Sequence, residues 1–126
     1  MDRFARRVYT IAGVYGLLVM SPQYFLEDRI GRDTPPPITH PEYFYGFIGV
    51  VLVWQLVFLV IAHDPVRFRP LMPVTVLEKL VFASPVAVLY AQGRVQRPTL
   101  FFAGIDLVLA VLFFLSYRYL GAADPT

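Results

Sequence analysis

Asp106 is the residue whose type and position most suggest chemistry. It lies about seven residues into the apolar stretch 99–120, which on a membrane-crossing helix places its carboxylate roughly 10 Å below the membrane surface. A carboxylate at that depth is costly unless it is protonated or partnered. Ala103, Asp106 and Ala110 are spaced i, i+3 and i+7, so they form a stripe that should face other helices. Asp106 is therefore the first candidate for a functional side chain.

Three polar side chains of other apolar stretches are expected at a similar depth: Tyr15, Gln55 and Ser84. Pro85 adds a free backbone acceptor, because a proline inside a helix cannot donate to the preceding turn. One interpretation is a polar pocket around Asp106 that binds a ligand or exchanges a proton. The alternative is structural: a protonated Asp106 donates a hydrogen bond to Gln55 or Tyr15 and only fixes helix register.

A second group of charges is expected near the cytoplasmic end of the stretch 73–92. Glu78 and Lys79 lie one turn into it, and Arg67 and Arg69 precede it. The structural interpretation is that Lys79 extends to the lipid headgroups while Glu78 pairs with a loop arginine. The functional alternative is a cytoplasmic-side site in which Glu78 meets a substrate or a proton.

No pattern in the chain predicts a catalytic residue, a metal site or a cofactor. His40 and His63 flank the stretch 43–62, which separates them by about 30 Å along a helix, so they cannot share a metal or a haem within one chain. The absence of cysteine removes thiol and iron–sulfur chemistry. No Ser-His-Asp order, phosphate-binding loop or zinc-type histidine motif occurs. We therefore favour a role without catalysis.

The elements that must position these side chains are membrane spans. Residues 43–62 are twenty residues without a charge, about 30 Å of helix, which matches the hydrocarbon thickness of a bilayer. Weaker stretches at 7–25, 73–92 and 99–120 complete the set, and the proline-rich segment 26–42 forms the longest loop. Only 16% of residues are charged, against about a quarter in soluble domains. We predict a single domain over 1–126: an all-α, four-helix antiparallel transmembrane bundle in which sequential helices are neighbours.

The distribution of basic residues predicts the orientation of the bundle. An even number of spans places both ends on one side, and the first stretch lacks a small-residue cleavage site, so we expect it to remain as a span. With both termini cytoplasmic, seven basic residues lie inside and four outside. The inner set is Arg3, Arg6, Arg7, Arg67, Arg69, Lys79 and Arg118, and the outer set is Arg29, Arg32, Arg94 and Arg97. No basic run is long enough to bind nucleic acid.

Small residues predict where the helices approach one another closely. They are paired or repeated on one face in three of the stretches, and such spacing allows close packing in lipid. The sets are Gly13 with Gly16, Gly46 with Gly49, and Ala83 with Ala87 and Ala91. Tyr9, Tyr90, Tyr117 and Tyr119 are expected near the interfaces, where amphipathic rings are favoured.

Two segments of the chain carry a family resemblance: THPEYFYGFIGVVLVWQLVFLVIAHDPVRFRP and LMPVTVLEKLVFASPVAVLYAQGR. Their span spacing and the Asp-Pro and Glu-Lys positions resemble small bacterial four-span proteins of the DoxX-like type. The resemblance implies a four-helix bundle of two hairpins in the bacterial inner membrane. It assigns no activity and therefore no site residue. The small multidrug exporters also have four spans, but their hallmark glutamate in the first span has no counterpart here.

Three hypotheses for function follow, in the order in which we favour them. The first is a non-catalytic accessory protein that binds a membrane-protein partner or a second copy of itself. The second is a binder of an apolar ligand, such as a quinone or a lipid, in a pocket of Asp106, Gln55, Tyr15 and Ser84. The third is a dimeric transporter that couples a solute to a proton at Asp106.

Overall fold

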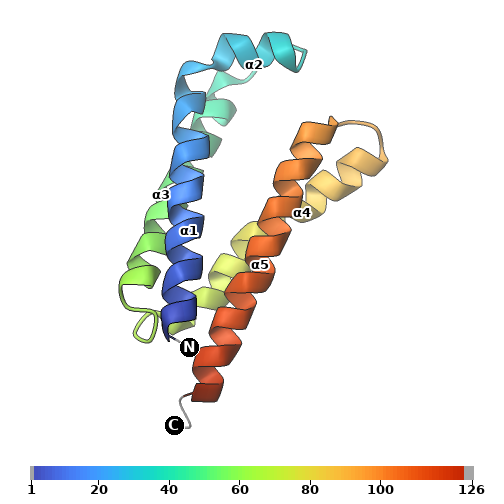
Figure 1. Ribbon diagram of the computed structural model, residues 1–126. Helices are drawn as coiled ribbons and strands as arrows, with labels where there is room; N and C mark the ends of the chain where they lie inside the picture. The colour runs from blue at the N-terminus through green and yellow to red at the C-terminus, as the bar shows by residue number, and fades with distance from the viewer. Residues whose placement is uncertain (1, 124–126) are drawn as a thin grey trace.

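The computed structural model describes residues 2–123, and all regular secondary structure in that range is helical (Figure 1). Four long helices are joined by three connections, two of which contain shorter helical elements. The long helices are α1 (Asp2–Met20), α3 (Pro41–His63), α4 (Met72–Ala91) and α5 (Arg97–Ala123). The short ones are η1 (Ser21–Phe25), α2 (Glu27–Asp33) and η2 (Arg69–Leu71). The all-α prediction is confirmed.

Three of the described helices are long and apolar enough to cross a membrane. They are α3, α4 with its preceding turn, and α5. Each contains one of the predicted stretches 43–62, 73–92 and 99–120 to within one residue. α1 is set apart by its first two turns, which carry Asp2, Arg3, Arg6 and Arg7. These charges shorten its apolar part, so α1 is not an apolar helix of spanning length by itself.

The long helices pack as two hairpins, α1 with α3 and α4 with α5. The hairpins meet at the end that holds the start of α1 and the last turns of α5, and they diverge toward the other end (Figure 1). Backbones of the two hairpins approach most closely between α1 and α5. Sequential helices are thus close neighbours within each hairpin, but α3 and α4 are separated more widely than the short connection between them led us to expect.

The hydrophobic core lies where the two hairpins meet. Its centre is aromatic, because the ring of Tyr9 stacks on Phe113 at 4.3 Å between centroids and meets the edge of Phe58 at 6.1 Å. All three side chains are fully buried. A second, smaller cluster of Ala83, Val86 and Ala103 lies within the α4–α5 hairpin. The main core therefore holds the hairpins together near one end only.

Helix ends follow local signals in the chain. The Ser21-Pro22 step ends α1 at Met20, so the predicted stretch 7–25 is a helix from residue 2 followed by the turn η1. Gly93 ends α4 as predicted, with a positive φ of 71° that glycine adopts without strain. The segment 26–42 was expected to be a loop, but residues 27–33 form α2, which lies across the end of the first hairpin, and α3 already begins at Pro41 (Figure 1).

Only some of the predicted small-residue faces pack against another helix. A Cβ at Gly16 would overlap the side-chain amide of Gln55, and one at Gly13 would lie 2.7 Å from Leu59, so this face of α1 packs closely on α3 as predicted. Gly46 borders open space. Of the three α4 alanines, Ala83 is buried, whereas Ala87 and Ala91 are exposed. The expected α4 face is therefore not an internal packing surface of this chain.

Candidate functional site

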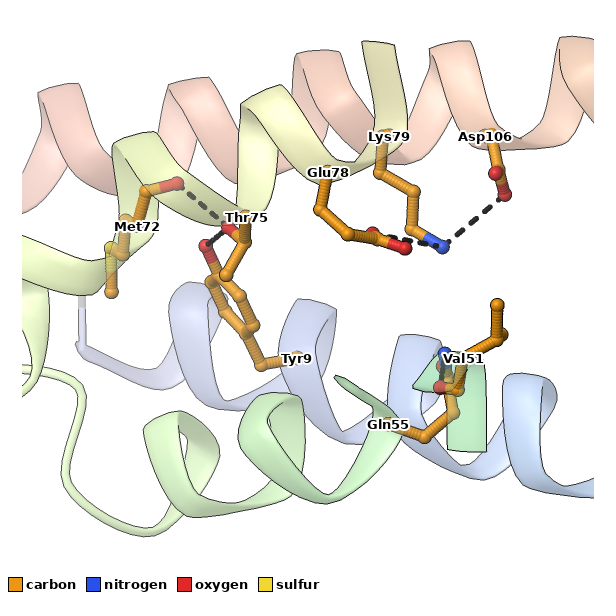
Figure 2. A network of polar contacts seen from close by, with 8 residues as sticks. All are labelled: Tyr9, Val51, Gln55, Met72, Thr75, Glu78, Lys79 and Asp106. Atoms are coloured by element: carbon orange, nitrogen blue, oxygen red, sulfur yellow. Dashed lines mark hydrogen bonds and ion pairs between the residues drawn. The ribbon is translucent and has the colours of Figure 1, made fainter. Parts of the chain in front are cut away.

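The candidate site is an ion triad in which one lysine lies between two carboxylates. Lys79 Nζ donates a hydrogen bond of 3.3 Å to Asp106 Oδ1 and lies 3.7 Å from Glu78 Oε2 (Figure 2). The Lys79 side chain is 6% exposed, that of Glu78 15% and that of Asp106 18%. The triad joins α4 to α5 well inside the helical layer, so its charges lie in surroundings where ions are costly.

The charges of the triad do not balance. With both carboxylates ionised, the three side chains carry one negative charge in excess. Glu78 Oε2 is also buried without a hydrogen-bond donor among the described residues. Its contact with the Lys79 ammonium at 3.7 Å is an ion pair that is too long for a hydrogen bond. A buried acceptor without a hydrogen bond costs about 1–3 kcal/mol, and more when it is charged. The arrangement therefore calls for a proton, a cation or a ligand that donates a hydrogen bond.

The other hairpin faces the triad with aromatic side chains. The Lys79 ammonium lies 5.1 Å from the ring centroid of Phe58 on α3, a cation–π contact. Tyr15 on α1 is half-buried and packs against the same core as Phe58. The charged residues of α1 and α3 are confined to the ends of those helices, so the first hairpin brings no second cation to the triad.

A second polar network lies beside the triad and is neutral. The Thr75 hydroxyl donates to the carbonyl of Met72 at 2.7 Å, which leaves the Tyr9 hydroxyl to donate to Thr75 at 2.8 Å (Figure 2). Tyr9 and Thr75 are both fully buried. This network joins α1 to α4 across the two hairpins with both hydroxyl groups paired. Tyr9 was expected at an interface, and instead it lies at the centre of the core.

The four residues of the predicted pocket occupy different surroundings. Asp106 lies in the triad, with Ala103 and Ala110 of its stripe buried as predicted. Gln55 is buried but donates to the carbonyl of Val51 at 2.8 Å on its own helix, with its Oε1 unpaired among the described residues. Ser84 is exposed on α4. The predicted hydrogen bond from Asp106 to Gln55 or Tyr15 is not formed, because Asp106 accepts from Lys79, and Ser84 lies outside any such pocket.

The expected grouping of Arg67 and Arg69 with Glu78 also needs correction. Arg69 stacks on the ring of Tyr117 at 3.9 Å and donates to its carbonyl at 3.0 Å, near the end of α5. Arg67 uses its backbone amide to bind Asp64, and its side chain is exposed over Phe68. Lys79 does not extend to the headgroups, because it is held by the two carboxylates inside the bundle.

The histidines lie away from the triad. His40 Nδ1 is 3.2 Å from Glu42 in an exposed pair at the start of α3. His63 ends α3, where its carbonyl accepts a hydrogen bond of 2.8 Å from Arg6. Within residues 2–123, no group of three histidine or acidic side chains is placed to hold a metal ion.

Sequence reasoning assigned Lys79 and Asp106 to different sites, although a signal for their pairing exists. Lys79 lies twelve residues before the end of α4, and Asp106 lies nine residues after the start of α5. In an antiparallel hairpin these positions differ in depth by only about 4–5 Å, a gap that a lysine side chain can bridge. Counting from the Gly93 turn would therefore have paired them.

Comparisons of the chain with protein-family models, with curated proteins and with solved structures give no match.

Proposed function

We propose that the chain is a four-span protein of the bacterial inner membrane, with α1 as the fourth span and both termini in the cytoplasm. Two observations support α1 as a span. It packs against α3, and Arg6 donates to the carbonyls of Ala62 and His63, so the charged start of α1 lies level with the end of a membrane-length helix. The basic residues then favour the cytoplasm on that side. The DoxX-like resemblance is part of this proposal.

We further propose that the triad is a proton-exchanging site that binds an apolar ligand bearing a hydrogen-bond donor, such as a quinol. One observation carries this proposal: Lys79 is buried between Glu78 and Asp106 and neutralises only one of them. A proton on the second carboxylate, or a donor from a ligand, removes the excess charge and satisfies Glu78 Oε2. A site of this kind binds and releases a proton without catalytic machinery.

A second candidate is the accessory role, in which a partner helix binds to α4. The supporting observation is that Ser84, Ala87 and Ala91 form an exposed small-residue face at spacings of three and four. Such faces allow close helix contact in lipid. Proton-coupled transport by a dimer would use the same triad together with this outward face.

The infrared spectrum of the protein in detergent tests the triad proposal. A protonated carboxylic acid gives a carbonyl band that an ionised carboxylate lacks. We expect that band at neutral pH in the parent and its loss in both Glu78→Gln and Asp106→Asn, because either change removes the excess charge. The matched control Asp33→Asn alters an exposed carboxylate and should leave the band unchanged. A parent spectrum without the band between pH 5 and 9, with or without decylubiquinol, would contradict proton exchange.

A further inference from the structure

A groove lies on the outside of the second hairpin, where the end of α4 meets the first half of α5. Its volume is about 580 Å³, within the range of about 300–1,000 Å³ usual for ligand sites. Tyr90 of α4 and Arg97, the first residue of α5, are its polar lining residues. The rest of the lining is apolar and includes Leu100, Phe101, Gly104 and Val108.

The length of this groove matches one leaflet of a bilayer. Its residues on α5 extend from Arg97 to Val108, a rise of about 16 Å, which is half of the ~30 Å hydrocarbon layer. A partner helix would be expected to contact α5 beyond the midplane as well. Gly104 forms the hollow of the groove, because a Cβ there would meet no atom within 4 Å. The shape therefore suits an acyl chain lying along α5.

The charge at one end of the groove suits an anion. Arg97 is exposed and makes no ion pair within residues 2–123. The connection 92–96, which precedes it, contains no acidic residue. The start of α5 adds the partial positive charge of a helix N-terminus. No carboxylate lines this groove, whereas the groove at the opposite end of the bundle contains Asp64 beside His63 and Arg67.

We propose that this groove binds one anionic phospholipid from the leaflet nearest to the connection 92–96. The phosphate group lies against Arg97 at the start of α5, and the Tyr90 hydroxyl lies at headgroup level beside it. One acyl chain fills the hollow over Gly104, between Phe101 and Val108. The site is separate from the triad, so it does not depend on the function proposed for Glu78, Lys79 and Asp106.

Native mass spectrometry of the delipidated full chain tests this proposal, with dioleoyl-phosphatidylglycerol and dioleoyl-phosphatidylcholine as probes. We expect the first bound phosphatidylglycerol to bind roughly fivefold more tightly than phosphatidylcholine, the effect of one basic residue near anionic lipid. Arg97→Gln should remove that preference. Gly104→Leu should fill the hollow and lower the occupancy of both lipids.

Matched controls separate this site from general effects of charge and volume. Arg94→Gln changes an arginine of the preceding connection 92–96, which donates to Gln92 Oε1 at 3.1 Å and does not line the groove. Gly46→Leu fills open space on the other hairpin. Both variants should bind lipid as the parent does. If Gly104→Leu fails to fold, Phe101→Ala replaces it, because removing this exposed wall of the groove should also weaken binding of both lipids.

Two results would overturn the proposal. The first is equal binding of the two lipids by the parent, or an unchanged preference in Arg97→Gln. The second is a dimer of the parent that Gly104→Leu or Phe101→Ala dissociates while lipid occupancy stays the same, because the groove would then be a contact between copies of the chain.

Discussion

Two polar clusters lie beside each other in the bundle, and they differ in charge and in how completely their polar groups are hydrogen-bonded. In the neutral network, Tyr9 donates to Thr75 and Thr75 donates to Met72, so both hydroxyl groups are paired. In the charged triad, Lys79 faces two carboxylates, and one buried oxygen of Glu78 has no hydrogen-bond donor within the described part of the chain. Phe58 contacts both clusters, so they share the same core.

This comparison separates interactions that stabilise the fold from a charged group that the fold does not require. A neutral hydrogen bond between α1 and α4 fixes how the two hairpins meet and leaves no polar group unsatisfied. A buried lysine with one carboxylate could fix the α4–α5 register equally well, but the second carboxylate adds a charge that costs stability. Groups retained at a cost are typical of functional sites. The triad is therefore the region from which we expect function.

The largest effect is expected from Lys79→Met, which keeps the length of the side chain and removes its charge. Glu78 and Asp106 are then left together without a cation, and breaking a buried ion pair in this way costs about 3–5 kcal/mol. The loss should be smaller at pH 5 than at pH 8, because protonation of the remaining carboxylates removes their repulsion. Thermal unfolding in detergent at both pH values measures it.

The triple variant Glu78→Gln, Lys79→Met, Asp106→Asn is the matched control for that loss. It removes the whole triad with little change of volume, so most of the stability should return. A triple variant as unstable as Lys79→Met would mean that packing of the lysine stem, rather than its charge, holds α4 against α5.

A smaller effect is expected in the neutral network. Tyr9→Phe removes the hydroxyl that donates to Thr75, and Thr75 keeps its own hydrogen bond to Met72. The free energy of unfolding should fall by about 1 kcal/mol, the net worth of one hydrogen bond, and equally at pH 5 and pH 8. Tyr43→Phe, at a side chain that is 72% exposed, should change stability by less than about 0.5 kcal/mol. A pH-dependent loss in Tyr9→Phe would break the distinction between the two clusters.

Much of the fold could be predicted because long apolar stretches bounded by charges and prolines give a simple helical pattern. A charge-free stretch of membrane length predicted α3, and the Gly93 signal predicted the end of α4. The divergence of the hairpins could not be predicted in the same way. Short connections limit which helices can be neighbours, but the contact between α1 and α5 depends on how Tyr9, Phe58 and Phe113 pack, and periodicity does not contain that information.

The site was predicted only in part. The depth of Asp106 and its stripe of small residues identified it as an inward-facing acid, which the structure agrees with. Its partner Lys79 was missed, because a lysine two turns from the start of a helix can extend outward to the headgroups or inward to an acid. The local sequence does not distinguish these two directions. The prediction that Ser84 faces the pocket was wrong for a similar reason. The sequence indicates how far along the helix Ser84 lies, but not which side of the helix it occupies.

The most direct test of the triad as a functional site is the thermal stability of Asp106→Asn against the parent from pH 5 to 9, with Asp33→Asn as the control. A proton held in the folded triad and released on unfolding makes parent stability fall as pH rises, because the folded state then binds more protons than the unfolded state. Asparagine leaves Lys79 paired with Glu78 alone, so we expect the variant to be as stable as the parent at pH 5, more stable at pH 9, and less sensitive to pH. A variant that melts below the parent at every pH would show that Asp106 is a structural partner of Lys79 and would contradict proton exchange at the triad.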